Sequence, residues 1–456
     1  MNQQLVAAVR PSGLALDGGK TWLLIVGLML VLKLAAVVLY VPASKSIFDL
    51  GFSFDPYVIS LYEGKGFVSC GPAGCDHSTR MPALPFFVTA LSFLTLNLRL
   101  AAAIKACLLS ALVYFACRDF AERLTARTPL QFGLYAGLAA FIVFSPDLIK
   151  HMTAVHYEEG YLIEIQAITL IATLMLVLKP QDKIGWRDAL FPVAFASLAY
   201  LFKSSQILVW AVVVLTVCGL ALRAKRPVLA AGALAFALIA PVSWLAHNVA
   251  TGHRASVMSS YDGENMFRGW NAHTLDLYPA CHLDTLFVAL RTCEGQPVEL
   301  PREIGRAAYP DEWAWNDGYK ARAMTWIRDN PQAAARTLAV KAATFFLAPR
   351  LVPYLLMDET SETRRRPAEE FLSAAWIVLG RVLELAALAM SGWLVVRGEG
   401  RARLVGLVSF SLLMAYAAPY VLGFATERHF SLFILLCALC NFFLIDQILD
   451  ARRERR

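Results

Sequence analysis

The chain has 456 residues, of which 58% are hydrophobic and 17% are charged, and its mean hydropathy is +0.53. This composition excludes a water-soluble globular domain and is typical of a helical protein that crosses a membrane several times. The formal net charge of +7 does not indicate nucleic-acid binding. The Lys and Arg residues stand in short segments between apolar runs, where they set membrane orientation.

The first apolar run, 21–42, follows a polar N-terminus. It is longer than the ~7–15-residue core of a signal peptide, so we expect a retained helix rather than a cleaved leader. A transmembrane helix needs about 20 apolar residues, and the pattern predicts an all-α polytopic protein with about ten such helices, in a range of roughly nine to thirteen. The predicted helices are 21–42, 98–117, 131–147, 159–178, 188–203, 205–222, 228–247, 371–396, 402–423 and 428–449.

Basic clusters follow every second predicted helix. The clusters contain Arg118, Arg123 and Arg127; Lys179, Lys183 and Arg187; Arg223, Lys225 and Arg226; Arg397, Arg401 and Arg403; and the C-terminal ARRERR. All of them fall on one side, which the positive-inside rule makes cytoplasmic. We therefore expect both termini in the cytoplasm.

Two further apolar segments, 81–97 and 337–357, would reverse this charge pattern if they crossed the membrane. We therefore predict that both are interfacial helices on the outer face. Three regions divide the chain: a transmembrane module at 1–247, which includes a first outer loop at 43–97; an outer loop at 248–370; and C-terminal helices with a basic tail at 371–456. A shorter outer turn is expected at 145–160.

Four cysteines fall in the predicted outer loops, as the pairs Cys70 with Cys75 and Cys281 with Cys293. Closely spaced cysteines in an oxidising compartment predict disulfides, and the sequence leaves open whether these pairs form them. A metal site made by Cys70, Cys75 and His77 would need a fourth ligand, which the sequence does not supply.

The first outer loop carries the first candidates for chemistry. Asp55 follows the first helix and could act as a general base on a hydroxyl, or it could cap the short helix that Pro56 opens. Arg80 stands before Pro82 and Pro85, where it could bind a phosphate bidentately or anchor the chain at the interface.

Further candidates come from the other outer links. Glu158 and Glu159 open the fourth helix, and Glu164 lies about one turn deeper, where an ionisable group usually faces a cavity or a partner. Lys203, between the fifth and sixth helices, could snorkel or meet a phosphate. The polar segment 247–272 is either a substrate-binding turn or a capped loop. In the segment from Glu427 to His429, Glu427 and Arg428 either form a local ion pair or belong to a functional site. Together these links place carboxylates and cations on one outer face.

The order of these motifs resembles the membrane glycosyltransferases of the GT-C fold, within the superfamily of protein O-mannosyltransferases and lipid A aminoarabinose transferases. The matching features are D-x-Y at Asp55 and Tyr57, R-x-P-x-x-P beginning at Arg80, the acidic turn before the fourth helix, a basic residue at Lys203, segment 247–272, and TERHF at 426–430. The chain departs from the family pattern where Pro56 follows Asp55. Asp49 and Asp55 therefore both remain candidates for the catalytic carboxylate, and Glu158 and Glu159 for the acidic position.

The resemblance implies an inverting transfer of a sugar from a polyprenyl-phosphate donor to a glycan, glycolipid or protein at the periplasmic face of a bacterial inner membrane. Asp55 or Asp49 would be the general base, and Glu158 or Glu159 would orient the acceptor. The predicted donor-phosphate and substrate-binding residues are Tyr57, His77, Arg80, Lys203, Arg254, Arg428 and His429. No cofactor is required by the sequence, although some members of this superfamily use a divalent cation.

Three other classes compete with this expectation. A transporter or lipid flippase would show inverted repeats and broken helices, which the sequence does not reveal. A glycan polymerase or ligase of another membrane fold would share the substrates. A non-catalytic scaffold would not need carboxylates in four outer links. The sequence identifies neither the sugar nor the acceptor.

Overall fold

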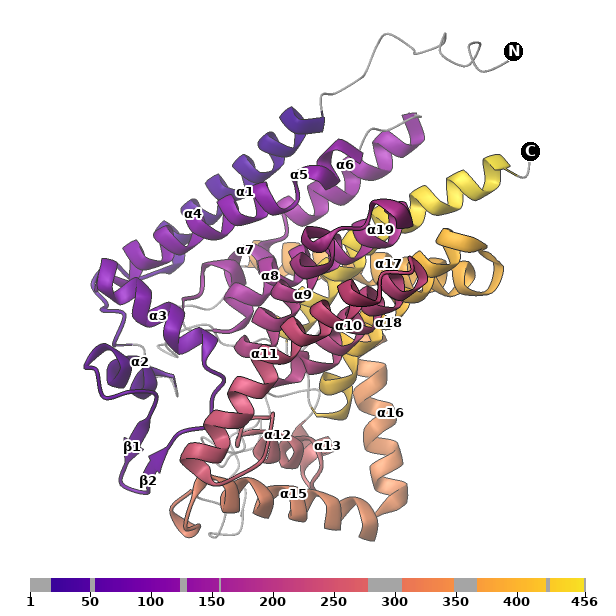
Figure 1. Ribbon diagram of the computed structural model, residues 1–456. Helices are drawn as coiled ribbons and strands as arrows, with labels where there is room; N and C mark the ends of the chain where they lie inside the picture. The colour runs from indigo at the N-terminus through magenta and orange to yellow at the C-terminus, as the bar shows by residue number, and fades with distance from the viewer. Residues whose placement is uncertain are drawn as a thin grey trace, which may run out of the picture.

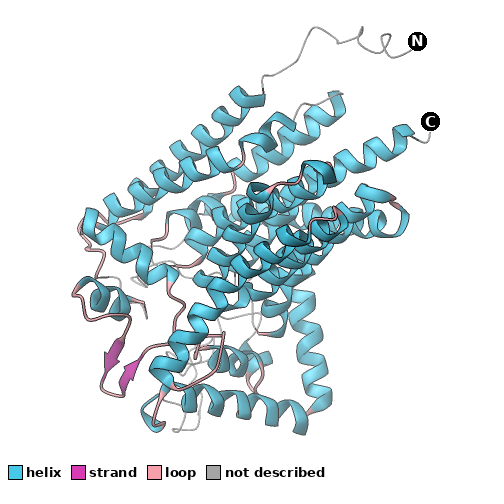
Figure 2. Ribbon diagram, viewed as in Figure 1, coloured by secondary structure: helices cyan, strands magenta, loops and turns pink. Residues whose placement is uncertain are grey.

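The computed structural model describes residues 18–49, 54–123, 129–155, 157–277, 306–347, 367–423 and 427–454. These residues are helical apart from turns and one two-stranded antiparallel hairpin (Figure 2). They include eight helices that are long and apolar enough to cross a membrane. The prediction of an all-α polytopic membrane protein is confirmed at this level.

The eight long helices form a bundle (Figure 1). They are α1 (Gly18–Tyr40), α4 (Leu98–Ala116), α8 (Glu159–Leu178), α10 (Ile207–Arg223), α11 (Pro227–Gly252), α17 (Pro367–Arg397), α18 (Gly400–Leu422) and α19 (Glu427–Glu454). Two other predicted spans, 131–147 and 188–203, form the shorter helices α6 (Pro129–Val143) and α9 (Trp186–Phe202). Helix α9 ends where Lys203 adopts an extended backbone, with φ of −153°.

The centre of the bundle is α8. It is apolar around its whole circumference, which is typical of a helix enclosed by other helices, and most of its side chains are buried. It packs against α9, α18 and α19, and α19 is largely buried too. The outer end of α8 therefore lies where several helix ends meet.

Shorter elements lie at the end of the bundle opposite to the start of α1 and the end of α19 (Figure 1). They are α2 (Asp55–Tyr62), β1 (Ser69–Gly71), β2 (Gly74–Asp76), α3 (Ala83–Leu94), α12 (Asp262–Gly269), α13 (Thr274–Leu277), α15 (Glu312–Asp329) and α16 (Pro331–Leu347). The remaining short elements are α5 (Arg118–Arg123), α7 (Pro146–Thr153), η1 (Gln181–Lys183), η2 (Ser204–Gln206) and η4 (Arg306–Ala308).

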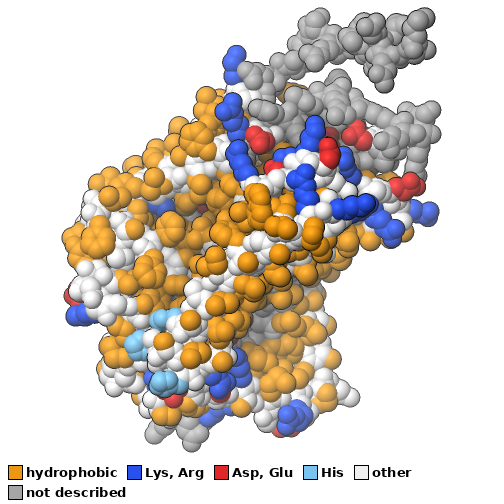
Figure 3. All heavy atoms as spheres, in the orientation of Figure 1, with side chains coloured by type: hydrophobic (Ala, Val, Ile, Leu, Met, Phe, Trp, Pro, Cys, Tyr) orange, Lys and Arg blue, Asp and Glu red, His pale blue; other side chains and the backbone are white. Residues whose placement is uncertain are grey.

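Lys and Arg side chains gather at the end of the molecule where α1 begins and α19 ends, above a broad apolar band (Figure 3). The links that join α8 to α9, α10 to α11 and α17 to α18 carry the basic clusters described above. This distribution is the one expected of a bundle oriented by the positive-inside rule.

The segment 81–97 forms α3, a helix of 12 residues, which is too short to cross a bilayer that needs about 20. One face packs inward, while Phe86, Phe93 and Leu94 are exposed. This amphipathic form agrees with the predicted interfacial helix. The segment 337–357 forms part of α16 up to Leu347, and its last ten residues lie outside the described part of the chain.

The expected outer turn at 145–160 contains a helix that the sequence analysis did not predict. Helix α7 begins after Ser145, whose hydroxyl accepts a hydrogen bond from the Leu148 N–H, and Pro146 occupies its first turn. A serine cap followed by proline is a known helix-start signal. The eight-residue helix is too short to produce an apolar period that stands out from the sequence.

The first outer loop contains the hairpin of β1 and β2, closed by a disulfide between Cys70 and Cys75. This bond excludes the alternative metal site with His77, because a disulfide sulfur is not a thiolate ligand. Among the described residues, no group of three or more His, Cys, Asp or Glu side chains is arranged to hold a metal ion. Cys281 and Cys293 lie outside the described residues.

Candidate functional site

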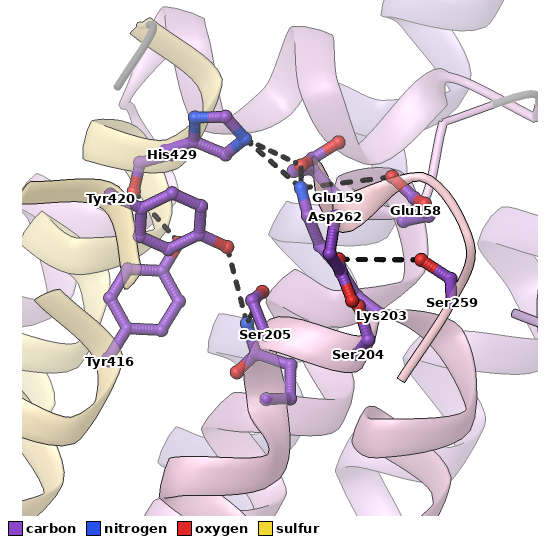
Figure 4. A network of polar contacts seen from close by, with 11 residues as sticks. Glu158, Glu159, Lys203, Ser204, Ser205, Ser259, Asp262, Tyr416, Tyr420 and His429 are labelled. Carbon is purple, nitrogen blue, oxygen red and sulfur yellow. Dashed lines mark hydrogen bonds and ion pairs between the residues drawn. The ribbon is translucent and has the colours of Figure 1, made fainter. Parts of the chain in front are cut away.

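Four side chains from three helix ends meet at the outer end of α8; we call them the Lys203 cluster (Figure 4). The Lys203 Nζ lies 2.5 Å from Glu159 Oε1, 3.8 Å from Glu158 Oε2 and 3.1 Å from His429 Nε2. The His429 Nε2 also lies 3.2 Å from Glu159 Oε1. Glu159 and His429 are buried, whereas Lys203 and Glu158 keep 17% and 12% of their side chains exposed. The cluster therefore has a polar edge on the protein surface.

Local helix chemistry explains why these groups occupy these positions. Glu159 stands in the first turn of α8, where the partial positive charge of the helix N-terminus favours a carboxylate. Lys203 directly follows the last turn of α9, where a cation is favoured. Both positions are thus favourable before the two side chains pair.

A second layer of hydrogen bonds holds the cluster in place. The His429 ring stacks on the Tyr420 ring, with 4.2 Å between the ring centres. The His429 backbone carbonyl accepts a hydrogen bond from the Tyr416 hydroxyl. The Gln206 Nε2 donates to the Tyr420 hydroxyl at 3.2 Å, and the Gln166 Nε2 donates to the Gln206 Oε1 at 2.6 Å. These contacts join α8, η2, α18 and α19, so His429 has little freedom to move.

Asp262, the first residue of α12, connects the cluster to the outer loop 248–277. Its Oδ1 accepts hydrogen bonds from Ser204 at 3.0 Å and from Ser259 at 3.4 Å (Figure 4). Within the described part of the chain, its buried Oδ2 has no hydrogen-bond partner. Burial raises the pKa of Asp262 above its ordinary value, and the two serine hydroxyls only partly oppose this.

This raised pKa predicts a pH-dependent stability. A carboxyl group whose pKa is higher in the folded than in the unfolded protein contributes stability below its ordinary pKa of about 3.9 and loses it as pH rises through the folded value. We expect the melting temperature of the wild type to fall as pH rises from acid values, and that of Asp262→Asn to fall less steeply. Melting curves of both proteins against pH measure this. Asp317→Asn is the control, because Asp317 is an exposed partner of Arg254, and an identical slope in wild type and Asp262→Asn would contradict the prediction.

The Arg80 guanidinium contacts two aromatic rings. It is 4.0 Å from the ring centre of Tyr261 and 4.8 Å from that of Phe54. The Tyr261 hydroxyl donates to Glu264 at 3.0 Å and accepts from Arg268 at 2.7 Å, which fixes its ring. Cation–π contacts of this kind hold an arginine side chain in place.

Asp55 is adjacent to this arginine site. It is the first residue of α2, and its neighbour Phe54 lies against Arg80. Phe54 occupies the cap position and makes no side-chain cap bond. Asp55 is 9% exposed. The alternative interpretation of Asp55 as the cap residue therefore differs from the structure by one position, because Phe54 is the cap and Asp55 is the first helical residue.

Asp49 and Tyr57 have different surroundings. Asp49 is exposed, and its carboxylate accepts a hydrogen bond from the Ser46 N–H within a turn. Tyr57 is fully buried, stacks on Phe67 and shares a 2.6 Å hydrogen bond with Thr79. Burial raises the pKa of Tyr57, so its hydroxyl stays protonated. The Tyr57 side chain has no exposed surface in this conformation, and its role in substrate binding stays a prediction.

Glu312, which the sequence analysis did not select, fastens the first outer loop to α15. Its two carboxylate oxygens accept hydrogen bonds from the N–H groups of His77 and Ser78, both at 2.9 Å, and from the Ser260 hydroxyl at 2.7 Å. The Ser260 N–H donates to the Ser78 carbonyl at 2.8 Å. Segment 77–80 is thereby held beside segment 260–262, which places Arg80 on the Tyr261 ring.

We expect Glu312→Ala to release this segment. The change leaves two backbone N–H groups without their acceptor, at about 1–3 kcal/mol each, so the local opening free energy should fall by about 2–6 kcal/mol. Hydrogen exchange at the His77 and Ser78 amides measures it. Glu63→Ala is the control because Glu63 makes an exposed ion pair with Lys65, worth at most about 1 kcal/mol. Equal exchange rates in the two variants would contradict the assignment.

The other predicted site residues lie elsewhere. His77 contributes its backbone to Glu312, and its carbonyl contacts the His247 ring at 2.9 Å. Arg254 is exposed and pairs with Asp317 at 2.8 Å, which is an ordinary surface ion pair. Arg428 lies in the first turn of α19, and its side chain is outside the described part of the chain.

Lys33 is also absent from the predicted site residues. Its Nζ lies 2.8 Å from Glu164 Oε1 within the bundle. The signal was present, because a lysine inside the first apolar run is as unusual as the glutamate in the fourth. Asp262 and Glu312 gave no comparable signal, since both stand in polar segments where carboxylates are common.

Neither a protein-family model, nor a curated protein, nor a solved structure matches this chain. The fold defines the class as an integral membrane protein of the all-α polytopic type. Within that class, the site consists of ionisable groups from several links, gathered at one end of the bundle.

Proposed function

We propose that this chain is a membrane glycosyltransferase that moves a sugar from a polyprenyl-phosphate donor to an acceptor hydroxyl at the outer face, with the active site between Asp55 and the Lys203 cluster. The supporting observation is a continuous series of contacts. Arg80 touches Phe54, the neighbour of Asp55, and also touches Tyr261. The next residue, Asp262, bonds to Ser204, the neighbour of Lys203.

This arrangement provides the groups that the reaction needs. Arg80 and Lys203 supply two cations at the end of the bundle where the short helices α2, α3 and α12 lie, and a phosphate leaving group is stabilised by fixed positive charge. Asp55, Glu158 and Glu159 supply carboxylates in the same region. An exposed apolar face on α3 next to α2 gives a lipid-linked donor a path from the bilayer.

In the proposed step, Asp55 takes the proton of the acceptor hydroxyl while the hydroxyl oxygen forms a bond to the anomeric carbon. The bond from that carbon to the phosphate oxygen breaks with its electron pair, and polyprenyl phosphate leaves. Attack from the face opposite to the leaving group inverts the anomeric configuration. Asp49 is the weaker candidate, because its carboxylate is exposed and belongs to a turn with Ser46.

In this scheme, Lys203 binds the phosphate of the donor once the substrate is present. It is neutralised by Glu159 at rest, and its exposed edge lets a phosphate take the place of Glu158, the more distant carboxylate at 3.8 Å. His429, within 3.2 Å of Glu159, can accept or return a proton as the charge in the cluster changes.

The test is transfer by the purified protein. The full chain in nanodiscs is incubated with radiolabelled polyprenyl-phosphate sugars and a membrane extract, and label is followed into glycan, glycolipid and protein fractions. We expect transfer from one donor class, with release of polyprenyl phosphate in equal amount. Movement of intact donor across the bilayer without bond cleavage would favour the flippase alternative. No transfer from any donor would reject the proposal.

A further inference from the structure

A second site lies inside the bundle, below the Lys203 cluster. A cavity of about 370 Å³ is lined by α1, α4, α5, α6, α7, α8 and α19. This volume falls in the ~300–1,000 Å³ range of small-molecule pockets and far exceeds the ~10–15 Å³ that one water requires. Its walls are apolar for most of its length, with Trp22, Met29 and Leu435 among the lining residues.

The cavity has one polar end. The Lys33 Nζ donates to Glu164 Oε1 at 2.8 Å and to the Ser110 hydroxyl at 3.1 Å, and all three residues line the cavity. Lys33 and Glu164 are each about 2% exposed. Among the described residues, Glu164 Oε2 has no hydrogen-bond partner, and the two bonds of Lys33 use two of the three ammonium hydrogens.

A buried carboxylate oxygen without a hydrogen-bond partner is costly. The polar end thus presents one acceptor, Glu164 Oε2, beside one N–H of Lys33. A hydroxyl group satisfies both, because it donates its hydrogen to Glu164 and accepts from Lys33. A carboxylate or phosphate would instead meet the negative charge of Glu164, and an alkyl chain end would satisfy neither group.

The shape of the cavity indicates the rest of the ligand. Along α1 it extends from Trp22 to Lys33, and 11 residues at 1.5 Å give roughly 16 Å. An extended chain advances ~1.2 Å per bond, so this length takes about a dozen carbons. Phe132 and Ala136 of α6 line the cavity and are also exposed, which gives it an opening toward the bilayer.

We propose that this cavity binds a neutral long-chain alcohol, with the hydroxyl on Lys33 and Glu164 and the chain directed toward the start of α1. The site does not depend on the proposed transfer reaction. It differs from the outer-face site, because Glu164 lies one to two helical turns deeper than Glu159 in α8.

The experiment uses a photoreactive long-chain alcohol carrying a diazirine, added to the full chain in phosphatidylcholine nanodiscs. After illumination, labelled peptides are identified by mass spectrometry. We expect labels on α1, α6 and α19, and competition by 1-dodecanol at about tenfold lower concentration than by dodecane or dodecanoate, since hydrogen bonds to charged groups give that discrimination. Equal competition by all three would overturn the proposal, because it would leave only an unselective apolar void.

Matched variants localise the effect. Ala139→Trp places bulk in the cavity, whereas Ala140→Trp places it on the exposed side of the same helix. Labelling should disappear in the first and persist in the second; equal labelling would overturn the assignment of the cavity. The double variant Lys33→Met, Glu164→Leu keeps the volume and removes the polar end. It should abolish the preference for dodecanol over dodecane, and a preference that survives in this folded variant would reject the role of these two residues.

Discussion

Asp55→Asn is expected to lower sugar transfer by about 10²–10⁴-fold, the range over which a positioned general base contributes. The amide keeps the shape of the carboxylate and cannot take the proton. Since Asp55 is the first residue of α2 and an asparagine is tolerated at a helix start, the melting temperature should stay close to that of the wild type. Binding of polyprenyl phosphate should also persist, so the loss should appear in kcat rather than in the Kd for the lipid.

Asp49→Asn is the matched control for this experiment, because it makes the same chemical change in the same outer loop. Asp49 is exposed and bonds to the Ser46 N–H, so we expect transfer to remain within about twofold of wild type. An active Asp55→Asn protein together with an inactive Asp49→Asn protein would move the general base to Asp49. Two fully active variants would reject both Asp49 and Asp55 as the general base.

The second large effect is expected from Glu159→Leu. Removing one partner of a buried ion pair leaves an uncompensated charge and costs about 3–5 kcal/mol. Glu158, 3.8 Å from Lys203, remains to offset part of that cost, so the loss should fall in the lower half of this range. Unfolding of the detergent-solubilised protein measures the change. Glu63→Leu, which breaks the exposed pair with Lys65, should cost no more than about 1 kcal/mol.

The double variant Glu159→Leu, Lys203→Leu separates stability from function. Replacing both members of a buried pair with apolar residues is often neutral for stability, so most of the lost free energy should return. If Lys203 binds the donor phosphate, transfer should nevertheless remain at least tenfold below wild type, which corresponds to about 1.4 kcal/mol of lost binding. Recovery of both stability and transfer would show that the pair has only a structural role.

Much of the membrane architecture could be predicted because it depends on residue-by-residue apolarity. The eight long helices coincide with apolar runs in the sequence. Basic clusters after every second predicted helix indicated which helix links share one end of the bundle. Charge parity also predicted that segment 81–97 does not cross the membrane, and α3 has only 12 residues. Helix α7 and the β1–β2 hairpin were missed, since eight-residue and three-residue elements are too short to produce a clear period.

The candidate site was predictable only in part. Glu158, Glu159, Lys203 and His429 were selected from separate links, and the structure brings them into one cluster. Their pairing could not be predicted, because it depends on how α8, α9 and α19 pack. Glu312 could not be selected for a related reason. Its partners His77 and Ser78 lie about 235 positions earlier, and no local pattern reports so distant a contact.

That distance has a consequence for biosynthesis. Chains grow at about 5–20 residues per second, so residue 312 is made roughly 10–50 s after residues 77 and 78. Until then the loop that carries Asp55 and Arg80 lacks the carboxylate that fixes its backbone. A truncated or stalled chain would therefore have its helices in the membrane without an ordered outer loop. The loop could be fixed in this way only when synthesis is about two-thirds complete.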